Sequence, residues 1–246
     1  MDGIFQQKVT VCDLHVDRWG RCKPSVLLYF AQEAATGHCD LLRLDWDTMD
    51  KQNLFWAVIR TRVQINRLPV LGETVTVQTW PMPTTRTAYP RAVSISDGDG
   101  NELVRIISLW VLMDTQTRAM VLPGKSGVTV TGQLRGCELA PPGSILPKAG
   151  ENTCLRRVNY TELDRNGHMN NTHAVDWVAD LLPSEFHKDH PVREFTVCYL
   201  SEGKEQQEIR LSWHLSDGPV LQADGYDAGC AQGEKPSRIF SVQMLF

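Results

Sequence analysis

The sequence lacks the features that mark membrane, secreted and nucleic-acid-binding proteins. No apolar run approaches the roughly 18 uninterrupted residues that a membrane-spanning helix needs. The first residues, Met1–Lys8, lack the basic and then apolar pattern of a signal peptide. Lys and Arg number 25 against 29 Asp and Glu, which gives a formal net charge of −4. Because no positive excess favours nucleic acid or an anionic membrane, neither is predicted as a partner.

The sequence also lacks the patterns of disulfide-rich, metal-binding and nucleotide-binding proteins. It has an odd number of cysteines, widely spaced and without a C-x-x-C pair, which favours the reducing cytoplasm. No H-E-x-x-H, G-x-S-x-G, Walker or dinucleotide glycine motif occurs. We therefore expect no metal and no organic cofactor. The seven cysteines are Cys12, Cys22, Cys39, Cys137, Cys154, Cys198 and Cys230.

What is present is enough apolar material for a sizeable core, arranged in two similar halves. The chain has 246 residues, of which 42% are hydrophobic. In the first half, apolar periodicity predicts a strand, a helix and four strands: 5–12, 25–44, 54–65, 74–80, 87–96 and 102–113. In the second half it predicts the same order: 152–158, 172–182, 194–200, 207–215, 220–226 and 238–246. A proline- and glycine-rich linker, 123–151, separates a domain of residues 1–122 from one of 152–246.

Short matches between the halves indicate a duplication. Asp17-Arg18-Trp19-Gly20 parallels Asp164-Arg165-Asn166-Gly167 at an offset of 147, and Thr79-Trp80 parallels Ser212-Trp213 at an offset of 133. The sequence therefore predicts an α+β protein made of two copies of one unit.

The loop at 164–171 carries the candidate chemistry. Asp164, Asn166 and His168 alternate along it, and a predicted helix follows. The first copy has Trp19 and Arg21 at the positions of Asn166 and His168, which favours one working site, in the second copy. A histidine suits general-base work near neutral pH, and free N–H groups at the helix start, near His168 and Met169, suit an oxyanion.

The same loop also has a purely structural interpretation. Asp164 and Asn166 suit a turn, and Asn170 or Asn171 suits the cap of the following helix.

The motif Asp164-x-Asn166-x-His168-x-Asn170-Asn171, with Trp177 after it, resembles the acyl-acyl carrier protein thioesterase family of plant plastids and bacteria. The resemblance covers nearly the whole chain. It implies a tandem hotdog fold, in which each sheet wraps a central helix. It also implies that the first copy binds the acyl chain, where Trp46, Met49, Phe55 and Trp56 are candidates, with Met169 as a further substrate contact. Ordinary core packing is the alternative for these residues.

The resembled plant proteins carry Glu-Cys-Gly on the strand after the second helix. Here the matching residues are Ser201-Glu202-Gly203, with Cys198 earlier on the strand. Glu202 thus stands where a cysteine is expected, and is the better candidate for an acidic or basic role. Whether Cys198 or Glu202 completes the site is left open.

The predicted function is hydrolysis of fatty acyl thioesters of acyl carrier protein, with water attack assisted by Asn166, His168, Glu202 and Asp164. The implied partner is an acyl carrier protein bearing a phosphopantetheine-linked acyl chain. Five arginines suit contact with an acidic carrier or a solvated sheet face: Arg60, Arg62, Arg67, Arg86 and Arg91.

Three other functions fit the same pattern: an acyl-CoA thioesterase, a hotdog hydratase or dehydratase, and a non-catalytic acyl-thioester-binding protein. The acyl chain length and the formation of a homodimer are left open.

Overall fold

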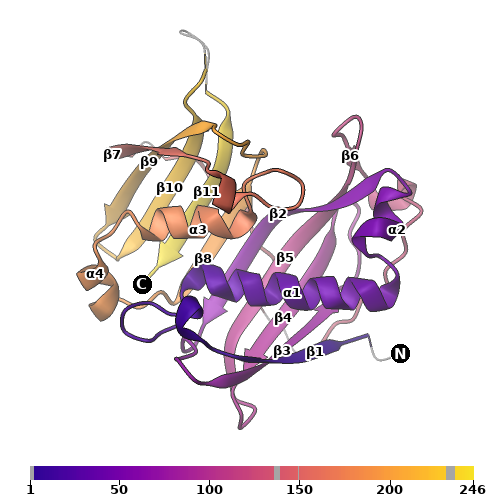
Figure 1. The fold of residues 1–246 in the computed structure, drawn as a ribbon, viewed down its shortest axis with the longest axis horizontal. Helices are drawn as coiled ribbons and strands as arrows, with labels where there is room; N and C mark the ends of the chain where they lie inside the picture. Colours follow the sequence, from indigo (N-terminus) through magenta and orange to yellow (C-terminus); the bar gives the residue numbers. More distant parts are fainter. Residues whose placement is uncertain (1–2, 136–138, 149, 231–235) are drawn as a thin grey trace. The chain divides into compact units, whose positions relative to one another are not determined.

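The computed structural model describes residues 3–135, 139–148, 150–230 and 236–246. The chain divides into two compact units, unit 1 (Met1–Pro142) and unit 2 (Gly143–Phe246). In each unit a helix lies against one face of an antiparallel sheet (Figure 1). This confirms the predicted α+β fold with two copies of a hotdog unit.

Unit 1 is built around the long helix α1, Pro24–Leu42. Proline at its first position suits a helix start, and Arg43, with φ of 57°, ends it in the left-handed conformation. Leu27, Phe30 and Ala34 belong to its buried face. The sheet order is β1-β3-β4-β5-β2, with β6 paired to β5. The strands are β1 (Phe5–Thr10), β2 (Leu54–Ile65), β3 (Thr74–Pro81), β4 (Tyr89–Ser96), β5 (Glu102–Asp114) and β6 (Met120–Val121).

Unit 2 repeats this plan with a shorter helix. The helix α3, Asn171–Ala179, buries Ala174, Val175, Trp177 and Val178. The sheet order is β8-β11-β10-β9-β7. The strands are β7 (Asn152–Arg157), β8 (Glu194–Tyr199), β9 (Glu208–Ser216), β10 (Val220–Asp227) and β11 (Arg238–Leu245).

Strand register corrects one of the two matches used to infer the duplication. Phe5 pairs with Thr79 in unit 1, and Asn152 pairs with Trp213 in unit 2. Since Phe5 and Asn152 are 147 positions apart, Thr79 corresponds to Trp213, an offset of 134. The predicted offset of 133 was wrong by one residue, which would turn every side chain of the strand to the opposite face.

Two short helices were not predicted. In unit 1, α2 (Trp46–Asp50) begins after Asp45, whose carboxylate accepts a hydrogen bond from the amide of Thr48 at 3.0 Å. In unit 2, α4 (Ser184–Asp189) follows Pro183. The helix predicted over 172–182 ends earlier, at Ala179. Helices this short carry too little periodicity to be recognised from the sequence.

The predicted linker is hydrogen-bonded to the sheets, its first part within unit 1 and its last part within unit 2. In unit 1, the amide of Gln133 donates to the carbonyl of Pro81 at 2.9 Å. In unit 2, the Gln222 side chain donates to the carbonyl of Leu146 at 2.8 Å, and the amide of Lys148 donates to Asp224 at 3.3 Å. Residues 136–138, which include Cys137, and residue 149 lie outside the described residues.

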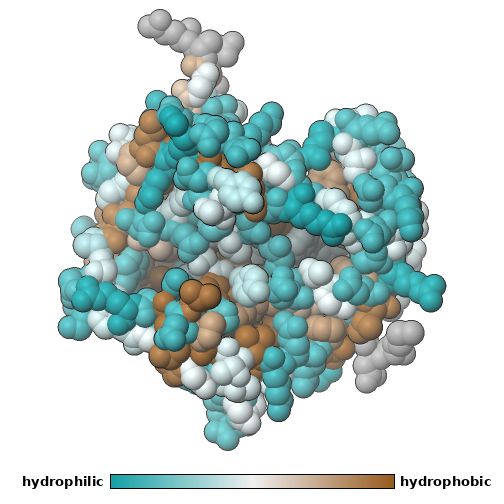
Figure 2. Space-filling view, viewed as in Figure 1, coloured by the Kyte–Doolittle hydropathy of each residue, from teal (hydrophilic) through white to brown (hydrophobic). Residues whose placement is uncertain are grey.

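The surface is largely hydrophilic on the face seen in Figure 2, with hydrophobic residues in smaller areas, one of them beside the start of α1. Leu14 and Tyr29 are exposed apolar residues of this part of the sequence. No helix in the described part of the chain is long and apolar enough to cross a membrane. The six cysteines within the described ranges are free thiols.

Candidate active site

Asp164 holds the loop that carries the candidate residues. Its Oδ1 accepts from the backbone amides of Asn166 at 2.8 Å and His168 at 3.1 Å. Its Oδ2 accepts from the side-chain amide of Asn166 at 3.3 Å. Gly167 adopts a φ of 75°, a conformation that glycine takes without strain. Asp164 therefore fixes both the loop backbone and the position of the Asn166 side chain.

The loop of unit 1 has the same backbone. Asp17 Oδ1 accepts from the amides of Trp19 at 2.9 Å and Arg21 at 3.0 Å, and Gly20 has a φ of 74°. The aspartate and the glycine thus shape the loop in both copies. The copies differ in the side chains presented: Trp19 and Arg21 in unit 1, Asn166 and His168 in unit 2.

Glu202 is brought to His168 by pairing between the loop and the segment that follows β8. His168 forms an antiparallel bridge with Lys204, and the amide of Met169 donates to the carbonyl of Gly203 at 2.8 Å. A side chain at position 203 would lie 3.0 Å from the Cβ of Met169, so glycine allows this approach. His168 Nε2 lies 3.3 Å from Glu202 Oε2, and both side chains are partly exposed.

Cys198 lies apart from this pair. It is buried, and its Sγ accepts from the amide of Ile145 at 3.4 Å and donates to the carbonyl of Gly143 at 3.5 Å. The thiol therefore packs against the 143–145 segment, while the described contacts of His168 include Glu202.

The expected oxyanion donors were misplaced. The amide of His168 is bound to Asp164, and that of Met169 to Gly203, so neither N–H is available. Asn170 caps α3, its Oδ1 accepting from the amide of Thr172 at 3.0 Å, which confirms the predicted capping role. Among the described residues, no acceptor contacts the amide of Asn171, the first residue of α3. This N–H and the side-chain amide of Asn166 are candidate donors in the described loop and helix start.

Glu162, which sequence reasoning missed, joins three parts of the site. Its Oε1 accepts from the indole N–H of Trp177 at 2.7 Å, and its Oε2 from the amide of Asn159 at 2.8 Å. Its carbonyl accepts from the amide of Asn170 at 2.8 Å. It thus ties the start of α3 to the loop. A glutamate two residues before Asp164 gave no signal by itself, because its partner Trp177 is a later helix residue.

Replacing Glu162 with alanine is expected to destabilise the protein by about 1–3 kcal/mol, because the indole N–H of buried Trp177 loses its acceptor. Glutamine at 162 keeps one acceptor oxygen, so it should retain most of the stability. Thermal unfolding measures both variants. Equal unfolding temperatures for alanine and glutamine would contradict the role assigned to this contact.

The predicted acyl-chain residues lie in packed surroundings. Met49 is buried in a cluster with Leu54, Tyr89 and Leu112, against which Trp56 packs. Trp56 also donates to the carbonyl of Leu44 at 3.2 Å. These contacts agree with the alternative of core packing. Met169, the candidate in unit 2, is half-buried beside Gly203.

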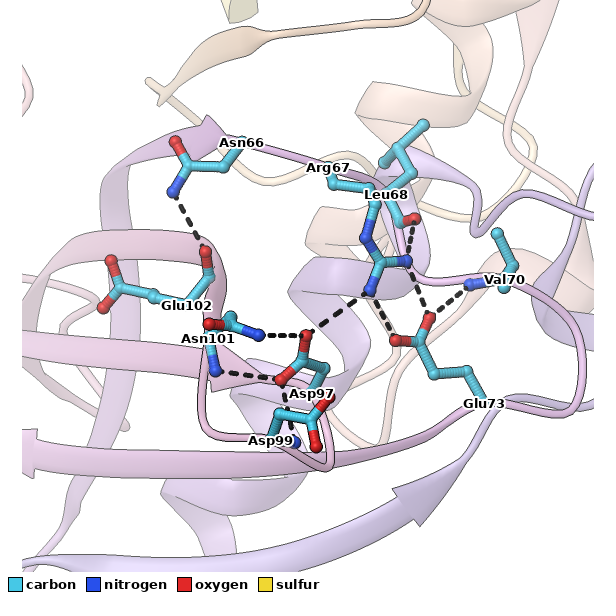
Figure 3. A network of polar contacts seen from close by, with 9 residues as sticks. All are labelled: Asn66, Arg67, Leu68, Val70, Glu73, Asp97, Asp99, Asn101 and Glu102. Atoms are coloured by element: carbon cyan, nitrogen blue, oxygen red, sulfur yellow. Dashed lines mark hydrogen bonds and ion pairs between the residues drawn. The ribbon is translucent and has the colours of Figure 1, made fainter.

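The predicted arginine surface is wrong for one of its five residues, Arg91, while Arg67 is exposed but ion-paired. Arg91 is buried under α1, where its side chain contacts His38. Arg67 is engaged by Glu73, with Nη2 at 2.6 Å from Oε1, and by Asp97 at 3.9 Å (Figure 3). The Glu73 contact raises the pKa of Arg67 and lowers that of Glu73, so the charge is balanced locally. Arg86 is also exposed.

No group of three or more His, Cys, Asp or Glu within the described ranges is placed to hold a metal ion.

Each half of the chain matches a domain model of one protein family. Residues 2–122 match the acyl-ACP thioesterase N-terminal domain, and residues 148–235 match the acyl-ACP thioesterase C-terminal domain. The first match contains α1 and the unit 1 sheet, and the second contains the Asp164–His168 loop and Glu202.

Relatives and solved structures are similar along most of the chain. A chloroplastic dodecanoyl-[acyl-carrier-protein] hydrolase of Umbellularia californica is 29% identical over 76% of this chain and 53% of its own length. A chloroplastic palmitoyl-acyl carrier protein thioesterase of Gossypium hirsutum is 25% identical over 89% of this chain and 57% of its own. The chain thus spans about half the length of the curated relatives it matches.

The crystal structure of an acyl-ACP thioesterase from Bacteroides thetaiotaomicron has a TM-score of 0.88 at 22% identity, over 99% of this chain and 98% of that one. The 12:0-ACP thioesterase from Umbellularia californica has a TM-score of 0.83 at 22% identity, over 100% and 97%. These two likenesses concern the fold, and the two domain matches concern the family. The protein belongs to the acyl-ACP thioesterase family of thioester hydrolases.

Proposed function

We propose that this protein hydrolyses fatty acyl thioesters of acyl carrier protein and releases free fatty acid. The observation that carries the proposal is the contact of Glu202 with His168. His168 lies on a loop that the first copy repeats with Arg21 in its place. The similarity to acyl-carrier-protein hydrolases over both halves of the chain supports the choice of substrate.

His168 acts as the general base in this proposal. When the imidazole is neutral, its Nε2–H donates to the Glu202 carboxylate, which leaves Nδ1 as the acceptor for a proton from water. The carboxylate then stabilises the imidazolium that forms as the water attacks the thioester carbon. General-base assistance of this kind contributes about 10²–10⁴-fold to a rate.

Asn166 and the amide of Asn171 stabilise the oxyanion. Asp164 binds one N–H of the Asn166 side-chain amide, and an amide group has a second N–H to donate. The amide of Asn171 opens a helix of nine residues, where unpaired N–H groups and the helix dipole favour negative charge. A donor aimed at the developing oxyanion contributes about 2.7–4 kcal/mol to transition-state stabilisation.

Initial rates on matched carrier-protein and CoA thioesters of one acyl chain test the proposal. We expect a higher kcat/KM on the carrier-protein thioester, with stoichiometric release of free acid. Equal or higher kcat/KM on the CoA ester would replace the proposed substrate with acyl-CoA. Addition of water to an enoyl thioester, without release of acid, would contradict hydrolysis and indicate a hydratase.

A further inference from the structure

Unit 1 contains a buried arginine between α1 and its sheet. Arg91, on β4, is only 8% exposed. Its Nη1 lies 3.2 Å from Nδ1 of His38 on α1 and donates to Thr79 Oγ1 on β3, also at 3.2 Å. Its Nη2 lies 3.9 Å from the Sγ of Cys39.

All three partners of this guanidinium are uncharged. Burial, and then the nearby Arg91, lower the pKa of His38 to about 4, so the imidazole is neutral and accepts from Arg91 at its Nδ1. Burial raises the pKa of the Cys39 thiol, which stays protonated. Among the described residues no carboxylate forms an ion pair with Arg91. A buried charge without a counter-charge is costly, which makes this an unusual arrangement for a purely structural residue.

A second arginine cluster among the described residues is built differently, with a partly exposed arginine beside a buried carboxylate. In unit 2, Arg238 Nη1 lies 3.2 Å from the Asp224 carboxylate, which is 1% exposed. There the positive charge has its partner within the same unit. Arg91 of unit 1 has no such carboxylate partner among the described residues.

The register of the two sheets shows that the strand residues beside Arg91 are polar, whereas their counterparts in unit 2 are apolar. Arg91, Ser108 and Thr61 lie side by side across β4, β5 and β2, and all three are buried. Cross-strand partners share one face of a sheet, so this row faces α1 with Arg91. The corresponding row of unit 2 is apolar and fully buried: Leu221, Met244 and Phe195.

The neighbouring row of unit 1 is apolar apart from Thr79. Val93, Ile106 and Val63 lie beside one another there, each 2% exposed or less. A ligand that matches both rows has a hydrocarbon part for the valines and isoleucine and an anionic end for Arg91. A carboxylate at the far end of an alkyl chain has this combination.

We propose that Arg91, His38 and Thr79 form a carboxylate subsite in unit 1, which accepts acyl groups that end in a second carboxylate. The proposal rests on the proposed function for the identity of the ligand as an acyl thioester. Its substrates are the monothioesters of α,ω-dicarboxylic acids. A guanidinium binds a carboxylate through charge-assisted hydrogen bonds, so Arg91 alone can hold the terminal carboxylate of such an acyl group.

The first test compares carboxylate-ended with methyl-ended acyl thioesters of equal length on the same carrier, over a series of lengths. At the best length, the wild type should prefer the carboxylate-ended ester. Arg91→Met should lower that preference by about 10-fold to 100-fold, the size of a lost hydrogen bond to a charged group. Arg91→Lys keeps the charge and should retain part of the preference. Arg86→Met, a change at an exposed arginine, should leave it unaltered.

The second test needs no catalysis. Free dicarboxylic acids should raise the unfolding temperature of the wild type and of Arg86→Met, but not of Arg91→Met, because a ligand stabilises the state it binds. Stabilisation without hydrolysis of either thioester would refute the proposed function and support the subsite. The subsite is overturned by a wild type that prefers the methyl-ended ester at every length, by an unchanged preference in Arg91→Met, or by the absence of any stabilisation.

Discussion

Replacing His168 with alanine is expected to lower kcat for acyl thioester hydrolysis by about 10²–10⁴-fold, because it removes the group that takes the proton from water. The KM should change little, since the interaction develops in the transition state. The loop backbone should persist, because Asp164 binds the main-chain amide at 168 rather than the imidazole. Steady-state kinetics with acyl carrier protein thioesters measure both constants.

Two companion variants sharpen this result. Glu202→Gln removes the carboxylate charge beside Nε2 while keeping the shape of the side chain, so kcat should also fall. Cys198→Ala is the matched control, since its thiol contacts the 143–145 segment and not His168. Wild-type activity in His168→Ala, or loss of activity in a folded Cys198→Ala, would show that the chemistry lies elsewhere.

Replacing Asp224 with alanine is expected to destabilise unit 2 by about 3–5 kcal/mol, because Arg238 then keeps a charge without its partner. Asp224 accepts from the amide of Lys148 at 3.3 Å and from the Ser241 hydroxyl, besides its contact with Arg238. The substitution therefore also removes the hydrogen bond that joins Lys148 to the sheet. Hydrogen exchange of the β10 and β11 amides and the urea midpoint measure the loss.

Asp217→Ala supplies the control for Asp224. Asp217 is exposed in the turn between β9 and β10, so its replacement should change stability by no more than about 0.5 kcal/mol. Similar exchange rates in the two variants would contradict the assigned role of Asp224.

The strands and the shared loop could be predicted from the sequence because their signals are local. The strand 54–65 was predicted with the bounds it has, from its apolar and then alternating residues. The Asp-x-x-Gly pattern marked both loops, because an aspartate that binds loop amides and a glycine with positive φ are both local requirements. The contact of Glu202 with His168 follows from the bridge of His168 to Lys204, and only the family resemblance pointed to it.

The errors have physical causes. The oxyanion donors were misplaced because the amide of Met169 pairs with Gly203, a partner far along the chain. Arg91 was counted as a surface residue, although it alternates in step with Tyr89, Val93 and Ile95, which are buried. Strand alternation would have placed it with them, so this signal was present in the sequence. The lack of a counter-charge, by contrast, depends on the tertiary contacts of α1.

Hydrolysis in H₂¹⁸O under single-turnover conditions, with enzyme in excess over acyl carrier protein thioester, tests the central claim most directly. If His168 and Glu202 activate a water molecule, the fatty acid released in the first turnover carries one ¹⁸O atom, and the Glu202 carboxylate carries none. Mass spectrometry of the acid and of the peptide containing Glu202 reads both outcomes. An unlabelled acid in the first turnover would contradict direct water attack and show that a protein carboxylate supplies the oxygen.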